Sequence, residues 1–196
     1  MFLKITIVLI FGVITTTAVI KAGKYYPNLP FGEYKIRFKA VFPCEPTTHH
    51  KLQYNLYFSR KSISVLELKG NMTYLVPFDD TVKVKINMAA RGSMGGWNEN
   101  AHVFTTTDAC GKMKFLMGNA WNVFVEELHF KSLDCPNVPG VYSTTGFSVD
   151  KLLETNFPKT FFYGEYKMLF NFTSKVNEHL GCVIFMVDIL RPWESY

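Results

Sequence analysis

The sequence lacks the motifs that mark the common classes of enzyme. No serine lies in the Gly-x-Ser-x-Gly turn of a hydrolase, and Gly92, Gly95 and Gly96 do not precede a helix with a Lys-Thr pair, as the glycines of a phosphate-binding loop do. None of the four cysteines belongs to a Cys-x-x-Cys pair, which argues against a zinc site. We therefore predict a protein that is not an enzyme and that needs no cofactor and no metal ion.

The histidines also lack a metal-binding pattern. His49 and His50 are adjacent, and adjacent side chains of a strand point to opposite faces, so these two would not bind one ion together. A proline and two threonines precede them, which indicates a solvated loop. The other histidines are isolated in the sequence: His102, His129 and His179.

Strong charge of either sign is absent as well. The formal net charge is +5, and Lys4 and Lys21 of the N-terminal leader contribute two of these charges, which leaves +3. The remaining basic residues are scattered, so nucleic acid is not an expected partner. Aromatic residues, in contrast, are abundant: 18 Phe, 10 Tyr and 3 Trp. Such side chains are favoured on pleated sheets and supply large apolar area.

Long apolar runs are missing except at the N-terminus. Residues 5–20 are apolar apart from threonine and glycine, a short basic stretch precedes them, and small residues follow. This layout predicts a secretory signal peptide, residues 1–22, cleaved between Ala18 and Lys24, and one mature domain, residues 23–196. A retained membrane anchor is the alternative, although the run is short for a span of roughly 20 residues. We expect the mature protein to be secreted and extracellular.

The cysteines and two glycosylation sequons agree with secretion. An even number of cysteines in an oxidising compartment predicts two disulfides, and the sequence alone permits three pairings. The sequons begin at Asn71 and Asn171, and Asn171 falls on the polar phase of its predicted strand, where a sugar can be carried. The cysteines all lie in the mature part: Cys44, Cys110, Cys135 and Cys182.

Most of the mature chain shows the two-residue period of half-buried strands. The predicted strands, which end at proline, glycine or polar turns, cover residues 33–42, 51–58, 63–68, 72–76, 82–88 and, as a short strand, 101–107. In the first of them, one set of side chains is expected to share a face: Tyr34, Ile36, Phe38, Ala40 and Phe42.

A final hairpin, within the block from Cys135 to Leu190, is expected to organise the rest of the fold. Its first strand places Tyr166, Met168, Phe170 and Phe172 on one face. The polar turn 174–178 should lie on the surface. Residues 180–190 then return as an apolar run that is too short and too β-branched to span a membrane.

One helix is predicted after Thr107-Asp108, which offers an N-cap. Gly118 weakens this helix by roughly 1 kcal/mol relative to alanine, but the apolar stripe is long enough to tolerate it. A stripe of this kind more often packs into a core than binds a ligand. Its members recur at three-and-four spacing: Met113, Leu116, Met117, Ala120, Trp121, Phe124, Val125 and Leu128. With the strands, it predicts a mostly β fold with one amphipathic helix, either a two-sheet sandwich or an irregular barrel.

Four short motifs resemble the ganglioside activator proteins of the ML lipid-recognition superfamily, and the chain is similar to insect relatives. The order and spacing of these motifs carry the resemblance, which covers about residues 110–190. It implies an immunoglobulin-like β-sandwich or cup, with a hydrophobic cavity between the sheets that binds or presents a lipid. The motifs are Cys135-Pro136, Gly140-Val141-Tyr142, Gly164-Glu165-Tyr166 and Leu180-Gly181-Cys182-Val183-Ile184.

The resemblance also implies a disulfide pairing, Cys44 with Cys182 and Cys110 with Cys135. Vertebrate activators have eight cysteines, so this chain lacks two of their four bridges, and their ganglioside specificity is not carried over.

A lipid site needs an apolar lining and no catalytic group, because each methylene removed from water contributes roughly 0.8 kcal/mol. The predicted lining comes from the helix and the final hairpin, and the same side chains would serve equally well in a filled core: Trp121, Phe124, Phe170, Phe172, Val183 and Phe185. Met94 and Trp97, on a glycine-rich loop, are candidates for a mobile apolar lip or a membrane-touching loop, or for a loop folded over the core.

The leading hypothesis is a secreted monomer that binds a lipid or small hydrophobic molecule and transiently contacts a membrane surface. The resemblance suggests a chemosensory or pheromone-related role. Two alternatives stay open: an extracellular protein-interaction module with a filled core, and an accessory protein that presents lipid to a hydrolase.

Overall fold

The computed structural model describes residues 28–46, 49–63, 65–153 and 155–194. The predicted signal peptide and its cleavage site lie outside the described residues. The strands are β1 (Phe31–Glu33), β2 (Lys35–Pro43), β3 (Leu52–Arg60), β4 (Leu66–Tyr74), β5 (Lys83–Arg91), β6 (Trp97–Thr106), β7 (Gly140–Ser148), β8 (Thr160–Phe162), β9 (Gly164–Thr173) and β10 (His179–Leu190). The helical segments are α1 (Ala109–Met117), α2 (Asn119–Glu127) and the 3-10 turn η2 (Val149–Leu153).

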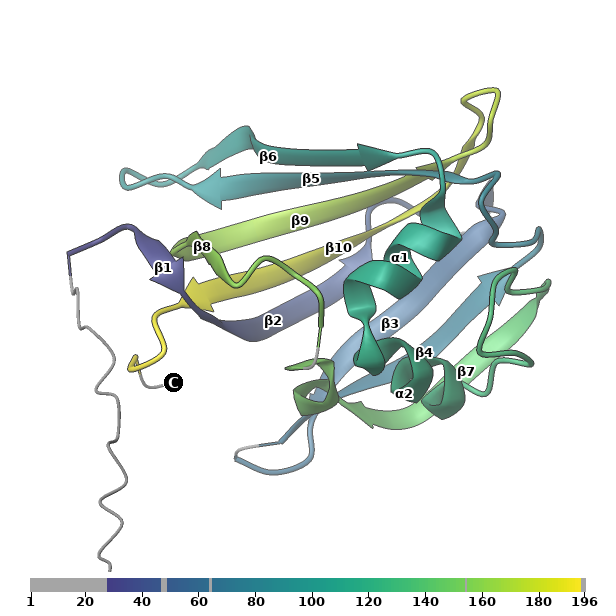
Figure 1. Cartoon of the computed structure of the whole chain (residues 1–196), viewed down its shortest axis with the longest axis horizontal. Helices are drawn as coiled ribbons and strands as arrows, with labels where there is room; N and C mark the ends of the chain where they lie inside the picture. The colour runs from purple at the N-terminus through teal and green to yellow at the C-terminus, as the bar shows by residue number, and fades with distance from the viewer. Residues whose placement is uncertain (1–27, 47–48, 64, 154, 195–196) are drawn as a thin grey trace, which may run out of the picture.

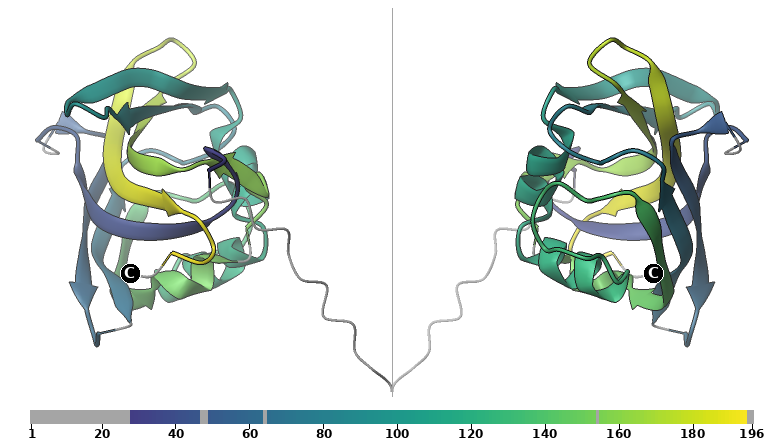
Figure 2. Two further views of the ribbon diagram at one scale, coloured as in Figure 1. Left: turned by 90° about the vertical axis from the view of Figure 1, so that its left-hand side faces the viewer. Right: turned by 90° about the vertical axis from the view of Figure 1, so that its right-hand side faces the viewer.

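Two antiparallel sheets form a sandwich. The larger sheet has the strand order β2-β10-β9-β5-β6 and the smaller one the order β3-β4-β7, while β1 and β8 pair separately. The chain passes from β6 of the larger sheet through α1 and α2 to β7 of the smaller one, so the two helices bridge that side of the sandwich (Figure 1). Figure 2 shows that β2 and β10 curve strongly around the interior. The predicted fold class, a mostly β sandwich, is confirmed.

The final hairpin lies in the middle of the larger sheet, as its apolar sequence requires. β9 pairs with both β10 and β5. Tyr166 and Phe172 of β9 are buried, as are Val183, Val187 and Ile189 of β10. The alternation along β9 therefore turns one row of aromatic and methionine side chains toward the smaller sheet.

Two predicted strands, residues 63–68 and 72–76, are in fact parts of one strand, β4. A strand end is expected at the glycine between them, but Gly70 continues the strand with a φ of +113°. A Cβ there would lie 2.0 Å from the backbone oxygen of Asn55 on β3, so only glycine fits this close approach. The pairing of β4 with β7 shifts register between Leu68 and Gly70, which is a β-bulge.

The face predicted for residues 33–42 is wrong beyond Phe38. The register of β10 against β2 shifts between Met186 and Val187, where β2 carries an extra residue. Because side chains alternate with a period of two, one extra residue inverts the faces that follow. Val41 is therefore buried, at 6% exposure, and Phe42 is 41% exposed.

The predicted single helix is two short helices. Gly118 has a φ of +56° and ends α1, and its N–H donates to the carbonyls of Lys114 and Phe115. Asp108 occupies the N-cap position within the predicted Thr107-Asp108 cap, but its side chain makes no capping hydrogen bond. Instead, Oδ1 of Asp80 accepts a hydrogen bond from the backbone N–H of Gly111, at 2.7 Å. The positive φ of Gly118 depends on tertiary contacts, so the apolar stripe in the sequence does not reveal that the helix ends there.

Two disulfides join Cys44 to Cys182 and Cys110 to Cys135, the pairing that the resemblance implied. They close loops of 138 and 25 residues. In the chain-entropy model such loops contribute roughly 5 and 3–4 kcal/mol of stability. Within the residues that the structure covers, no helix is long and apolar enough to cross a membrane.

Candidate functional site

A cavity of about 650 Å³ lies between the two sheets. β2, β3, β4, β9, β10, both helices, η2 and the segment 155–159 contribute side chains to its wall, most of them aromatic, aliphatic or methionine. Close-packed protein interiors leave few voids larger than a water molecule. The volume instead falls within the range of about 300–1,000 Å³ that is typical of small-molecule sites.

All six side chains predicted from the helix and the hairpin line this cavity. The strand residues are presented by the two-residue alternation of neighbouring, paired strands, with Val183 of β10 directly opposite Phe170 of β9. The indole N–H of Trp121 donates to the carbonyl of Leu133, at 2.7 Å, so this large side chain is buried without an unpaired polar atom. The six residues are Trp121 and Phe124 of α2, Phe170 and Phe172 of β9, and Val183 and Phe185 of β10.

Met94 and Trp97 lie elsewhere, at the tip of the β5–β6 hairpin, and do not line the cavity. The side chain of Met94 is completely exposed. The guanidinium of Arg91 and the ammonium of Lys167 lie 5.3 and 5.5 Å from the centre of the Trp97 ring, a cation–π arrangement on the outer surface. The glycine-rich sequence builds a turn that projects past the sheet rather than folding over the interior (Figure 1).

The smaller sheet supplies cavity residues that the sequence prediction omitted. Tyr54 of β3 stacks on Phe172 of β9 with ring centroids 5.4 Å apart, so this contact joins the two sheets. Met72 and Tyr74 of β4 also line the wall. The alternating pattern of residues 51–58 was visible in the sequence, but nothing local to that strand shows that it faces the final hairpin.

Asn137 is the polar side chain most deeply buried in the cavity wall, at 3% exposure. Its backbone N–H and carbonyl both pair with Phe78, at 3.0 and 2.9 Å, which fixes its position. Its amide nitrogen Nδ2 has no hydrogen-bond partner among the described residues. A buried donor without a partner is unfavourable by about 1–3 kcal/mol, so this amide is a polar group of the wall with a hydrogen bond still to make.

The buried tyrosines keep the cavity wall uncharged on the side of the smaller sheet. Burial raises the pKa of Tyr74, and burial also raises the pKa of Tyr54 well above its usual range, with the neighbouring Tyr74 adding to the effect. Both phenols are therefore neutral at physiological pH. They can exchange hydrogen bonds with a neutral polar group, but they do not attract an ion.

One end of the cavity carries the exposed and charged part of its lining. This rim includes Lys35 at the start of β2, Asp150 within η2 and Lys159 just before β8. Asn156 ties the rim to α1, because its side-chain nitrogen donates to the carbonyl of Phe115, at 2.8 Å, and its backbone N–H donates to Leu116. We call this the opening end, since its lining residues Asp150 and Lys159 are exposed.

The predicted glycosylation sites lie on the outer faces of the two sheets. Asn71 is on β4, where its side-chain oxygen accepts a hydrogen bond from Asn55 at 3.2 Å. Asn171 is on β9, on the face opposite Phe170 and Phe172, and beside the Cys44–Cys182 disulfide. Glycosylation of either residue stays a prediction.

No protein-family model matches the chain, and no curated protein matches it in sequence. Membership of the ML superfamily therefore stays a proposal. The cavity, its apolar wall and its single deeply buried amide are the features from which a function is inferred.

Proposed function

We propose that this protein is a secreted, non-enzymatic carrier that binds a lipid or another small hydrophobic molecule, and that it belongs to the ML lipid-recognition superfamily. The cavity of about 650 Å³ between the sheets is the observation that carries the proposal. Both disulfides support an oxidising, extracellular location.

The binding energy would come from burial of an apolar chain. Each methylene removed from water contributes roughly 0.8 kcal/mol, so a chain of about twelve gains roughly 10 kcal/mol. Lost rotational and translational freedom offsets part of this gain, by an amount of 4–15 kcal/mol that depends on the treatment. A long chain is therefore required, and a ligand of a few carbons would not be retained.

Asn137 narrows the ligand class. Its unpartnered Nδ2 is a donor that a rotation of the side chain would bring to a ligand, so the favoured ligand has a hydrogen-bond acceptor, such as an ester, ketone or hydroxyl oxygen, on its apolar chain. Tyr54 and Tyr74 line the same cavity as neutral phenols and would accept or donate a second hydrogen bond. A ligand of this kind is compatible with the chemosensory or pheromone-related role that the resemblance suggests.

Native mass spectrometry of the mature protein, secreted from insect cells, tests the proposal. We expect a population with one extra mass of a few hundred daltons, which organic extraction removes and identifies. A protein that leaves the cell without a ligand, and binds no member of a panel of long-chain alcohols, esters and fatty acids, would refute the carrier role.

The rival hypotheses make different demands. A protein-interaction module with a filled core has no use for a cavity of this size. A lipid-presenting accessory protein shares the cavity, and it would stimulate a glycosidase that acts on a membrane-bound substrate, whereas a simple carrier would not.

A further inference from the structure

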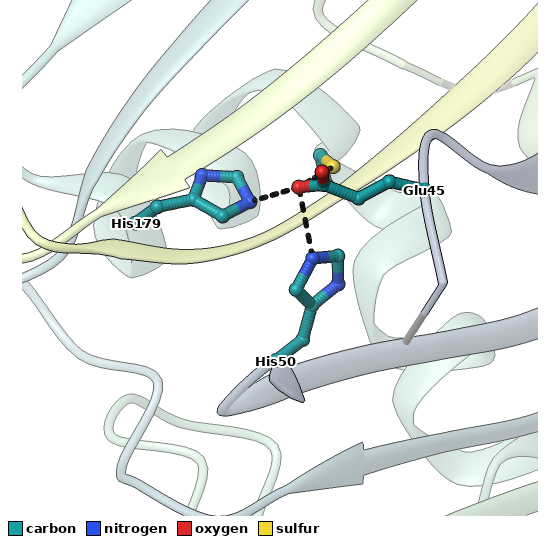
Figure 3. A group of neighbouring side chains, drawn as sticks. Glu45, His50 and His179 are labelled. Carbon is teal, nitrogen blue, oxygen red and sulfur yellow. Dashed lines mark hydrogen bonds and ion pairs between the residues drawn. The ribbon is translucent and has the colours of Figure 1, made fainter. Parts of the chain in front are cut away.

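Two histidines and a glutamate converge outside the cavity, beside the Cys44–Cys182 disulfide (Figure 3). Oε1 of Glu45 lies 3.1 Å from Nε2 of His50 and 3.0 Å from Nε2 of His179. The centroids of the two imidazole rings are 5.0 Å apart. Glu45 follows β2, His50 precedes β3, and His179 is the first residue of β10. We propose that Glu45, His50 and His179 bind one zinc ion.

The distances suit a small ion with nitrogen and oxygen ligands. Zinc binds imidazole nitrogen and carboxylate oxygen at about 2.0–2.2 Å in tetrahedral sites, so neighbouring ligand atoms lie about 3.3–3.5 Å apart. The two measured separations, 3.0 and 3.1 Å, need to widen by only a few tenths of an ångström to admit the ion. Rotation of the Glu45 side chain, which is 53% exposed, can supply that change.

The donor set favours zinc over calcium or magnesium. Two imidazoles and one carboxylate form a known zinc-binding combination that leaves a fourth position for water, whereas calcium and magnesium prefer oxygen ligands alone. The sulfur of Cys182 also lies within 4.8 Å of these atoms. It belongs to a disulfide, so it is not a thiolate and does not count as a ligand.

Two further observations indicate a built site. His50 is 95% buried, since its exposed fraction is 5%, and its ring directs Nε2 at Glu45 (Figure 3). A hollow of about 310 Å³ adjoins the cluster and is lined by Glu45, Asn171 and His179. Asn171 is the polar neighbour of the cluster in this hollow, and its amide oxygen is buried with no hydrogen-bond partner in the described chain.

The surroundings hold the ligands in place before an ion arrives. His50 is fixed by burial, and His179 lies opposite Thr173 in the β9–β10 pairing. The disulfide at Cys44 anchors the residue next to Glu45. An ion bound here would tie β3 of the smaller sheet to β10 of the larger one. Without an ion, the same side chains form a hydrogen-bonded cluster of two histidines and a glutamate, which is the alternative explanation.

Isothermal titration of the chelator-treated, disulfide-intact mature protein with zinc chloride separates the two explanations. We expect one zinc per chain, a melting temperature that rises with zinc concentration, and visible absorption bands of a four-coordinate site when cobalt replaces zinc. His179→Gln and Glu45→Gln each remove a surface-accessible ligand and should weaken zinc binding at least 100-fold.

His49→Gln is the matched control, because His49 is exposed, adjacent to His50 and outside the cluster. This variant should bind zinc as the unsubstituted protein does. Circular dichroism and the intact mass report folding and disulfides for each variant. Absence of stoichiometric zinc binding, or zinc binding that His179→Gln leaves unchanged, would overturn the proposal. Ligand binding in the cavity is measured in a separate experiment, and its outcome does not affect the zinc proposal.

Discussion

The two ends of the sandwich are built differently. β2 runs from Lys35 to Pro43 antiparallel to β10, so Leu190 lies beside Lys35 at the opening end and Val183 lies beside Pro43 at the other end. The Cys44–Cys182 disulfide and the Glu45–His50–His179 cluster are at that second end, which we call the closed end.

The second disulfide strengthens the contrast. Cys110 follows Ala109, whose N–H donates to the carbonyl of Val82 just before β5, and the start of β5 pairs with Thr173 near the closed end. Both disulfides thus lie toward the closed end, whereas the opening end is held together by hydrogen bonds and ion pairs. This asymmetry agrees with the proposed carrier role, in which a ligand enters through a part that opens without unfolding the rest.

The largest expected effect is on stability, from removal of the closed-end disulfide. Replacing Cys44 and Cys182 together with serine should lower the free energy of unfolding by roughly 5 kcal/mol, and replacing Cys110 and Cys135 by roughly 3–4 kcal/mol, because the first pair closes the longer loop. Urea denaturation followed by tryptophan fluorescence measures both. Equal losses, or none, would show that the two bridges do not act on the unfolded chain as proposed.

Hydrogen exchange should show the same asymmetry. Amides of the rim, η2 and residues 155–159, should exchange well before those of β10 near Cys182, and a bound ligand should slow exchange at the rim most. Mass spectrometry of peptic fragments resolves the two regions. Uniform protection at both ends would contradict an opening that moves independently.

Asn137→Leu tests the buried, unpartnered amide in the described part of the cavity wall. Removal of an unpartnered buried amide should leave the fold intact or stabilise it, whereas ligands with an acceptor should lose about 5–30-fold in affinity, equivalent to about 1–2 kcal/mol. A long-chain alkane of matched length is the control ligand and should bind equally well to both proteins. If the substitution lowers the affinity for both ligands to the same degree, Asn137 does not bind a polar group of the ligand.

The smallest expected effect is the pH dependence of the opening end. Hydrogen bonds from Lys61, and then from Lys69, lower the pKa of Glu67 below its ordinary 4.5, and Glu67 pairs with Ser148 just before η2. Because this pKa is lower in the folded state than in the unfolded state, Glu67 stabilises the fold at pH values above the ordinary carboxyl pKa. This stabilisation is lost as the pH falls through the pKa of Glu67 in the folded protein.

The test is the melting temperature between pH 7 and pH 3. It should fall less steeply for Glu67→Gln than for the unsubstituted protein. Glu99→Gln, which removes a carboxylate paired with Lys167 on the outer surface, is the control. If the melting temperature falls equally steeply with pH in all three proteins, Glu67 does not contribute to the pH dependence.

Local patterns predicted the sheet content and six of the residues that line the cavity, because alternation along β9 and β10 and the stripe through α2 are local properties. The errors arose where tertiary contacts decide. Gly70 resembles a turn residue until β3 is placed against it, and the bulge in β2 depends on its pairing with β10. The volume of the cavity depends on the distance between the two sheets, and this distance is set by contacts among many segments rather than by the sequence of any one of them.

The histidine cluster shows the same limit. Alternation along a strand places His49 and His50 on opposite faces, but it carries no information about residues from other elements. The structure brings His50 to His179, which lies on another sheet, and Glu45 joins them through the turn at Cys44. No spacing in the sequence marks such a set.

The central claim is that the cavity holds one hydrophobic guest, and a pair of methionine-to-tryptophan variants tests it most directly. Met117 of α1 lines the cavity, whereas Met94 is fully exposed on the β5–β6 turn. In a titration with an apolar fluorescent probe, the unsubstituted protein and Met94→Trp should each bind one equivalent. Met117→Trp, folded by circular dichroism, should bind at least tenfold more weakly. Equal binding by all three proteins, or no binding by the unsubstituted one, would contradict a carrier with its site between the sheets.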